Sequence, residues 1–281
     1  MSETHLKILT LAQVSGGQDW RLGLAHDRPH HTLVWITRGQ GRMLLDGRRR
    51  GVGTHNAVFI PKGALFALDL GRQGMGQAVL IPDGTPLRLP DMARQLRVRD
   101  VQVQYEIAGL IETAQREQNQ MRPLRQDAME AYVALMSVWL RRQIAQEEHV
   151  PAPRSAAERL SRDFAKLVSA RYASGAPMAD YAQTLGFTPT HLSRAVKAAT
   201  GKTAADLLTE RVVHAARTLL ETTPHPARNI SHHLGFGSAA YFTRFMQQHT
   251  GQTPSQLRNR STPPHSGSGP REHRVRQSAA P

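Results

Sequence analysis

The sequence contains no cysteine, which excludes disulfide bonds and thiolate metal sites. No apolar run approaches the roughly 18–20 residues needed to span a bilayer, and the first residues do not resemble a secretory leader. Hydrophobic residues make up 40% of the 281 positions, which is ordinary for a globular chain and enough for two domains. We therefore expect a cytoplasmic protein that does not contact a membrane.

Acidic residues are scarce relative to basic ones. The chain has 36 Lys and Arg against 22 Asp and Glu, a formal net charge of +14, and most of the excess lies after residue 150. A basic C-terminal half favours a polyanionic partner, and double-stranded DNA is the commonest candidate. Charge alone leaves a second interpretation open, in which the basic surface serves solubility.

Three changes of pattern divide the chain. Short β-rich runs separated by Gly-containing turns occupy residues 20–90 and predict an all-β sandwich or barrel. Apolar residues recur at helical spacing over 101–148, and a Pro-containing break follows at 150–155. Residues 156–258 read as helical throughout, whereas 261–281 are rich in Ser, Pro, Gly and Arg and predict a disordered basic tail.

An internal repeat lies in the helical part. Residues 185–208 and 234–257 share Leu-Gly-Phe, then Ser/Thr-Arg, then Thr-Gly, in the same order. Each copy has the parts of a helix-turn-helix: an apolar helix face, a Gly for the sharp turn, and a Phe that we expect to fill the space between the two helices. Residues 204–220 between the copies predict one rigid connecting helix.

The second helix of each copy carries the candidate DNA-binding residues. In the first copy Thr190, Ser193, Arg194 and Lys197 fall on the outward face, and in the second Ala239, Ala240, Thr243 and Arg244 do. A helix so placed can enter a major groove and present its N-terminal half to base edges. The alternative is a helical bundle that displays arginine by chance.

Residues 156–258 resemble the AraC/XylS family of bacterial transcription regulators, most clearly over 229–258. The resemblance implies base contacts from the same residues except Lys197. It also implies a homodimer, RNA polymerase as a partner, and activation of transcription. Small side chains at Ala239 and Ala240 depart from the polar residues often found there, so the second unit is expected to rely more on backbone contacts and DNA shape.

The β-rich part resembles the cupin-type sensor domain common in that family. Metal-binding cupins use several His and a Glu, but here no Glu follows His26, His30 and His31 within a few residues, and Phe66 stands where a His is expected. We therefore predict no metal, no other cofactor and no enzymatic activity. A small-molecule effector remains expected, because such a domain can enclose one. Its basic lining suits an aromatic or other organic acid, and the candidate pocket residues are His30, Trp35, Arg38, Phe59 and Phe66.

The predicted fold class is α+β in two domains. A cupin-like β-barrel that senses the effector spans 1–98, a helical dimerisation segment spans 99–149, an all-α DNA-binding domain with two helix-turn-helix units spans 155–260, and the tail spans 261–281. Leu110, Leu135, Trp139 and Ile144 are candidate dimer contacts, although the same face could instead pack on its own barrel. The predicted function is a transcription regulator that binds DNA sequence-specifically under the control of a small-molecule effector. The resemblance favours an activator, and repression stays open. The alternatives are a cupin-type enzyme fused to a DNA-binding module and a constitutive DNA binder without effector.

Overall fold

Two antiparallel sheets form the N-terminal half of the computed structural model, which describes residues 5–146 and 154–261. The elements of this half are β1 (Lys7–Thr10), α1 (Leu11–Ser15), α2 (Trp20–Gly23), β2 (His31–Arg38), β3 (Gln40–Leu45), β4 (Arg48–Gly53), β5 (Asn56–Ile60), β6 (Phe66–Asp69), β7 (Met75–Ile81), β8 (Arg94–Arg97), α3 (Val101–Asn119) and α4 (Arg125–Ala145). The five-stranded sheet has the order β1-β7-β2-β5-β8, and the three-stranded sheet has the order β4-β3-β6.

The predicted barrel is not closed. Strand β8 ends one sheet and strand β4 ends the other, so their backbones form no ladder with each other. A side chain spans the opening instead, where Gln95 Nε2 donates to the carbonyl oxygen of Gly51 at 2.7 Å. The expectation of a barrel is therefore corrected to an open sandwich, because strand periodicity predicts which face is buried and says nothing of ladder closure.

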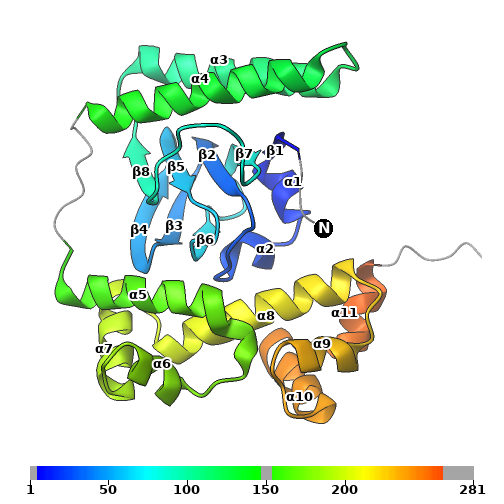
Figure 1. Cartoon of the computed structure of the whole chain (residues 1–281). Coiled ribbons are helices and arrows are strands. Elements are labelled where there is room, and N and C mark those ends of the chain that lie inside the picture. Colours follow the sequence, from blue (N-terminus) through cyan, green and yellow to red (C-terminus); the bar gives the residue numbers. More distant parts are fainter. Residues whose placement is uncertain (1–4, 147–153, 262–281) are drawn as a thin grey trace, which may run out of the picture.

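Alternation along β2 builds two separate cores. Val34 and Ile36 pack between the two sheets, whereas Leu33 and Trp35 face the other way, toward α3 and α4. A strand with apolar residues on both faces must be covered on both sides, because successive side chains point in opposite directions. Figure 1 shows this arrangement, with α3 and α4 lying across one side of the strands.

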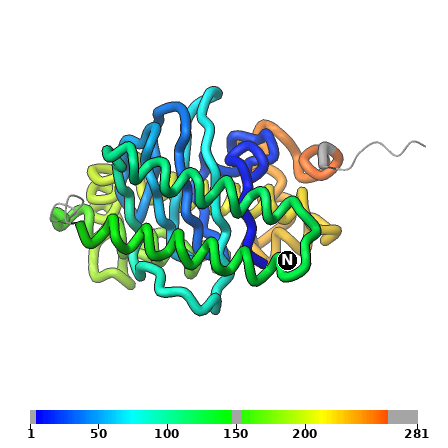
Figure 2. The backbone as a smooth tube through the Cα atoms, turned by 90° about the horizontal axis from the view of Figure 1, so that it is seen from above, coloured from blue at the N-terminus to red at the C-terminus, as the bar shows by residue number. Residues whose placement is uncertain are grey.

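Helices α3 and α4 form an antiparallel pair that runs side by side across the sheet, as Figure 2 shows from above. Asp100 begins α3 by accepting hydrogen bonds from the backbone N–H groups of Gln102 and Val103. Trp139 of α4 is 1% exposed, and its indole N–H donates to the carbonyl oxygen of Val103. This pair therefore closes the core on the outer face of the larger sheet.

The C-terminal half is helical, as predicted. Its elements are α5 (Ala156–Arg171), the short 3-10 helix η1 (Tyr172–Ser174), α6 (Met178–Thr184), α7 (Pro189–Thr200), α8 (Ala204–Thr222), α9 (Ala227–His233), α10 (Ala239–Thr250) and α11 (Pro254–Ser261). Leu44 and Ala67 on the smaller sheet share a core with Phe164 of α5. Helices α5 and α8 therefore lie against the side of the sandwich opposite α3 and α4 (Figure 1).

The predicted domain boundaries stay predictions, although they fall between elements: β8 ends at Arg97, α3 begins at Val101 and α5 begins at Ala156. The predicted tail lies outside the described residues apart from Ser261. Within the described part of the chain, no helix is both long and apolar enough to cross a bilayer.

Candidate nucleic-acid interface

Helices α6 and α7 form the first helix-turn-helix. Gly186 has a φ of +77°, so the turn between the helices uses a conformation that glycine adopts without steric cost. Thr188 caps α7 by accepting from the backbone N–H of His191, and Pro189 takes the first helical position. Leu192 and Val196 are fully buried, so their burial sets which face of α7 points outward.

The outward face of α7 carries the predicted residues. Thr190, Arg194 and Lys197 are exposed, and Ser193 is partly buried between them. No Asp or Glu lies on α7, so its exposed face is neutral or basic along its length. Such a face can approach a phosphate-lined groove without repulsion. The contacts of the individual side chains with DNA stay predictions.

Helices α9 and α10 form the second helix-turn-helix with the same construction. Gly235 has a φ of +77°, and Ser238 caps α10 by accepting from the backbone N–H of Tyr241. Ala239, Ala240 and Arg244 are exposed. Thr243 is partly buried, and its hydroxyl donates to the carbonyl oxygen of Ala239 at 3.0 Å. The second unit thus offers a DNA base fewer free polar groups than the first.

The turn phenylalanines differ between the units, which corrects one expectation. Phe236 packs with the second unit's core, close to Phe242 and Phe245. Phe187 is 44% exposed and stacks on His191 with ring centroids 4.9 Å apart, so it does not fill the space between its helices. The first unit has a small Ala195 where the second has Phe245, and no aromatic cluster forms to draw Phe187 inward.

Two exposed rings at equivalent repeat positions were missed from the sequence. His191 in α7 and Tyr241 in α10 each lie three residues after the capping residue, and both are exposed. Each ring contacts the turn phenylalanine of its own unit. In each copy the ring lies directly before a buried residue. Aligning the two copies from their capping residues places His191 and Tyr241 at the same position, and this alignment is the sequence signal that could have identified them.

Helix α8 joins the two units, and a second contact fixes their relative placement. Gly175 follows η1 and lies against Gly235, the turn glycine of the second unit; an added Cβ on Gly175 would lie 2.3 Å from the carbonyl oxygen of Gly235. Arg211 of α8 stacks over Tyr172 of η1 at 3.6 Å. The two helix-turn-helix units are therefore held by packing as well as by the connecting helix.

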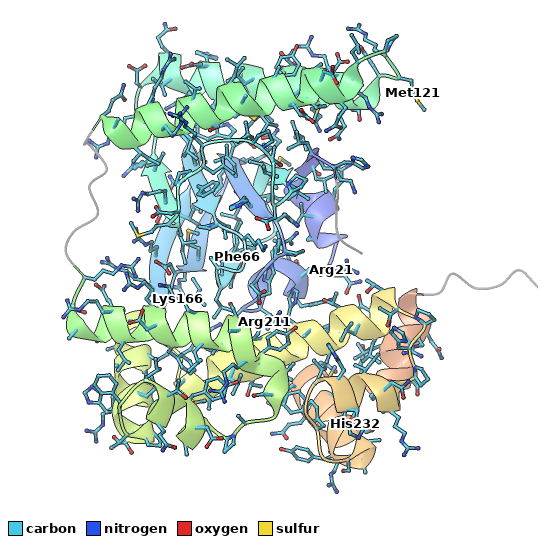
Figure 3. All side chains as sticks on the ribbon, in the orientation of Figure 1. Arg21, Phe66, Met121, Lys166, Arg211 and His232 are labelled. Atoms are coloured by element: carbon cyan, nitrogen blue, oxygen red, sulfur yellow. The ribbon has the colours of Figure 1, made fainter. Side chains whose placement is uncertain are left out.

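The sandwich docks on α8 through charged and aromatic groups. Arg211 pairs with Asp27, and Arg21 pairs with Glu221 at 3.0 Å. Figure 3 shows Arg21 and Arg211 between the strands and the helical half, with His232 on the far side of that half. These ion pairs join residues that are 184 and 200 positions apart in the sequence.

A stacked histidine pair lies in the same contact. The rings of His26 and His214 are 4.3 Å apart and nearly parallel. Burial, with Arg211 and Arg28 nearby, lowers the pKa of His214 to about 3. Burial and the neighbouring His214 likewise hold the pKa of His26 well below its usual value. Both rings are therefore neutral near pH 7, and each donates one N–H to a backbone carbonyl.

The five predicted effector residues lie in different surroundings. Trp35 and Phe59 belong to the core under α3 and α4, whereas Phe66 lies in the core between the sheets, where Figure 3 labels it. His30 is buried, and Arg38 is exposed at the end of β2. Their role in binding an effector stays a prediction. Over the described ranges, no group of three or more His, Asp or Glu residues could hold a metal ion.

The predicted dimer contacts divide in the same way. Leu110 and Ile144 pack on the core that contains Trp139, so these three side chains belong to their own domain. Leu135 differs, because it is 52% exposed. The alternative that this face packs on its own domain therefore holds for Leu110, Trp139 and Ile144. The homodimer itself stays a prediction.

One family model matches part of the helical half. Residues 181–260 match the family model of a helix-turn-helix domain. A histidine kinase P4 from Formosa agariphila is 36% identical over 80 residues, which are 28% of this chain; the chain spans only 6% of the length of that relative.

Solved structures similar to this chain have low sequence identity to it. ToxT from Vibrio cholerae is 10% identical with a TM-score of 0.44, over 92% of this chain and 99% of its own. The C-terminal domain of AraT, a response regulator from Geobacillus stearothermophilus, is 23% identical with a TM-score of 0.36, over 42% of this chain and 98% of its own. A transcriptional regulator with an AraC-type DNA-binding domain from Chromobacterium violaceum is 22% identical with a TM-score of 0.35, over 40% and 99%. The repeat and the family model agree, and residues 181–260 are an AraC-type helix-turn-helix domain.

Proposed function

We propose that this protein regulates transcription by binding DNA sequence-specifically through α7 and α10. The observation that carries this proposal is that both helices, each capped and supported by a buried face, present the exposed N-terminal half that groove reading requires. Their rigid connection through α8 suits two successive major grooves, about 34 Å apart on one face of a duplex. DNA with the matching pair of half-sites is the partner.

The two helices contribute unequally in this proposal. Helix α7 offers Thr190, Ser193, Arg194 and Lys197, which can donate to base edges or to phosphates. Helix α10 offers Arg244 next to two alanines, and the Thr243 hydroxyl is already hydrogen-bonded to its own helix. Helix α7 therefore supplies more of the sequence discrimination, and α10 supplies more of the positioning.

The sandwich supplies control by a small molecule. It contacts α8 through the Asp27–Arg211 and Arg21–Glu221 pairs. A change in this contact therefore reaches the helix that sets the distance between α7 and α10. An effector regulates only if it binds two arrangements of the domains with different affinity. We propose that it shifts the chain to the arrangement that activates transcription with RNA polymerase in the cytoplasm.

Dimerisation belongs to the same proposal. Tyr105 of α3 and Leu135 of α4 are 71% and 52% exposed, on the helix pair that lies farthest from the DNA-binding half. Large apolar side chains in water favour burial against a partner. A second copy that binds there would double the number of half-sites engaged.

A binding experiment tests the DNA-reading proposal. Selection from random duplexes should yield one preferred operator, and Arg194→Ala should weaken binding to it by about 1–3 kcal/mol while binding to random duplexes changes little. Lys166→Ala is the matched control, because Lys166 is an exposed cation on α5 near the sandwich (Figure 3). Equal losses on operator and random DNA would make Arg194 a phosphate contact.

The same experiment separates the alternatives. A constitutive DNA binder that uses charge alone would select no operator and would lose affinity steeply with salt on every sequence. A cupin-type enzyme fused to a DNA-binding module would instead copurify with a metal and turn over a substrate. Metal analysis of protein purified without an affinity tag checks that alternative.

A further inference from the structure

A groove of about 1080 Å³ lies where the two sheets fail to close. It runs between the edge strands β4 and β8 and is bounded by the loop between β6 and β7. Its lining includes Arg50, Arg72 and Arg97 together with Asn56 and Gln95, and it includes no Asp or Glu. A cavity lined by three cations and by amides is suited to an anion.

Strand register directs several of these side chains inward. Val58 belongs to the core between the sheets, and Gln95 is its cross-strand partner, so Gln95 shares the inner face. Asn56 and its partner Arg97 lie two residues farther along that same face. On β4, Arg50 is two residues before Val52, whose side chain belongs to the core between the sheets, so Arg50 lies on the same inner face. Polar side chains thus occupy positions that a closed sandwich would fill with apolar ones.

Arg50 lacks a carboxylate of its own. The two nearby acids are already paired, Glu158 with Arg48 at 2.8 Å and Asp46 with Arg154 at 2.6 Å. Among the described residues Arg50 forms no ion pair, and its buried Nε has no hydrogen-bond partner. Burial and the two neighbouring arginines lower its pKa. A bound anion would supply the missing counter-charge.

The groove lies away from the contact between the sandwich and α5. The turn at Gly47, between β3 and β4, contacts α5, where Ser161 donates to the carbonyl oxygen of Gly47. The groove includes Gln40 and Gly53, which pair at the other end of the same two strands. A ligand in the groove therefore need not displace the packing of α5 on the sandwich.

We propose that the groove between β4 and β8 binds a small organic anion with two or more carboxylates, held by Arg50 and Arg97 and oriented by Asn56 and Gln95. The groove volume lies just above the usual range of small-molecule sites, which runs from about 300 to 1,000 Å³. Two guanidinium groups on facing sheets suit two carboxylates of one molecule. The assignment of this anion as the effector rests on the function proposed above.

Calorimetric titration with citrate, at matched ionic strength and pH 7.5, tests the site. Wild-type protein should bind one citrate per chain, and Arg50→Gln and Arg97→Gln should each weaken binding about tenfold or more, as expected for loss of a charged hydrogen bond. Arg42→Gln is the control: Arg42 is exposed on β3 and alternates with the inward-facing Met43. Circular dichroism confirms that each variant is folded, and Arg97→Gln, at an exposed strand end, keeps the test valid if Arg50→Gln unfolds.

Three results would overturn the proposal: no citrate binding, equal binding by the Arg97→Gln variant, or inorganic phosphate binding as tightly as citrate. The last would show a general oxyanion site without preference for carboxylates. Operator binding by the same preparations is measured in parallel. Loss of operator selection with citrate binding intact would refute the DNA-reading function and leave the anion site standing.

Discussion

Asp27→Asn removes the carboxylate that neutralises Arg211 in the contact between the two halves. The Arg211 side chain is 8% exposed and the Asp27 side chain 19%, so water cannot replace the lost charge fully. Opposite charges about 4 Å apart attract by about 4 kcal/mol at an effective dielectric constant of 20. Breaking a buried pair by removing one partner costs about 3–5 kcal/mol. The Asn oxygen can still accept from Arg211, so we expect a loss near 3 kcal/mol, at the lower end.

Urea denaturation measures this loss. Far-ultraviolet circular dichroism follows the helices, and tryptophan fluorescence includes Trp20, which lies 4.3 Å from the Arg217 guanidinium in the same contact. Glu112→Gln is the control, because Glu112 pairs with Arg116 on the surface and both side chains are mostly exposed. Such a pair on one helix contributes about 0.3–0.5 kcal/mol.

The reasoning fails if Asp27→Asn costs no more than Glu112→Gln. A double variant provides a second check: Asp27→Asn combined with Arg211→Met removes both charges and keeps an apolar stem over Tyr172. It should be more stable than Asp27→Asn alone, because no buried charge is left unpaired. A double variant less stable than the single one would show that packing, rather than charge, dominates this contact.

Two further predictions concern the junction of the two units and the buried histidines. Gly175→Ala should lose at least about 1 kcal/mol more stability in urea than Gly63→Ala, since both have φ near +70° but only the Gly175 position meets the Gly235 carbonyl oxygen; equal losses would show that backbone strain alone matters. Wild-type stability should fall as pH drops from 6.5 toward 3, by up to about 1.4 kcal/mol per pH unit for each proton, because His214 takes up its proton in the unfolded chain first. His214→Gln should flatten that slope, with His26 still contributing, and identical slopes between pH 7.5 and 5 would contradict the assignment.

Local patterns predicted the DNA-binding half well. Gly186 and Gly235 adopt the left-handed turns that the repeat required, and Thr188 and Ser238 cap α7 and α10. Turns, caps and helix faces depend on residues within a few positions of one another. The prediction that Phe187 fills the space between its helices was wrong, because the burial of a side chain depends on the residues that face it. Ala195 leaves Phe187 no aromatic cluster to join.

The N-terminal half was less predictable. Strand periodicity indicated the sheets, yet it did not show that β4 and β8 stay apart or that Trp139 packs on the outer face of the larger sheet. Trp139 had two possible positions, a dimer surface and its own core, and amphipathic spacing is the same for both. The polar face formed by Asn56, Gln95 and Arg97 became visible only with the register between β5 and β8.

The sequence by itself determined that two helix-turn-helix units exist and which faces of α7 and α10 are exposed, because the residues that specify each unit lie within one short stretch, 185–208 or 234–257. The tertiary structure alone decided how the sandwich sits on α8. Asp27 and Arg211 are 184 positions apart, and nothing in either local pattern indicates the other. It also decided where the two sheets stay open. Such contacts are selected by the fit of whole surfaces, which hydrophobic periodicity does not encode.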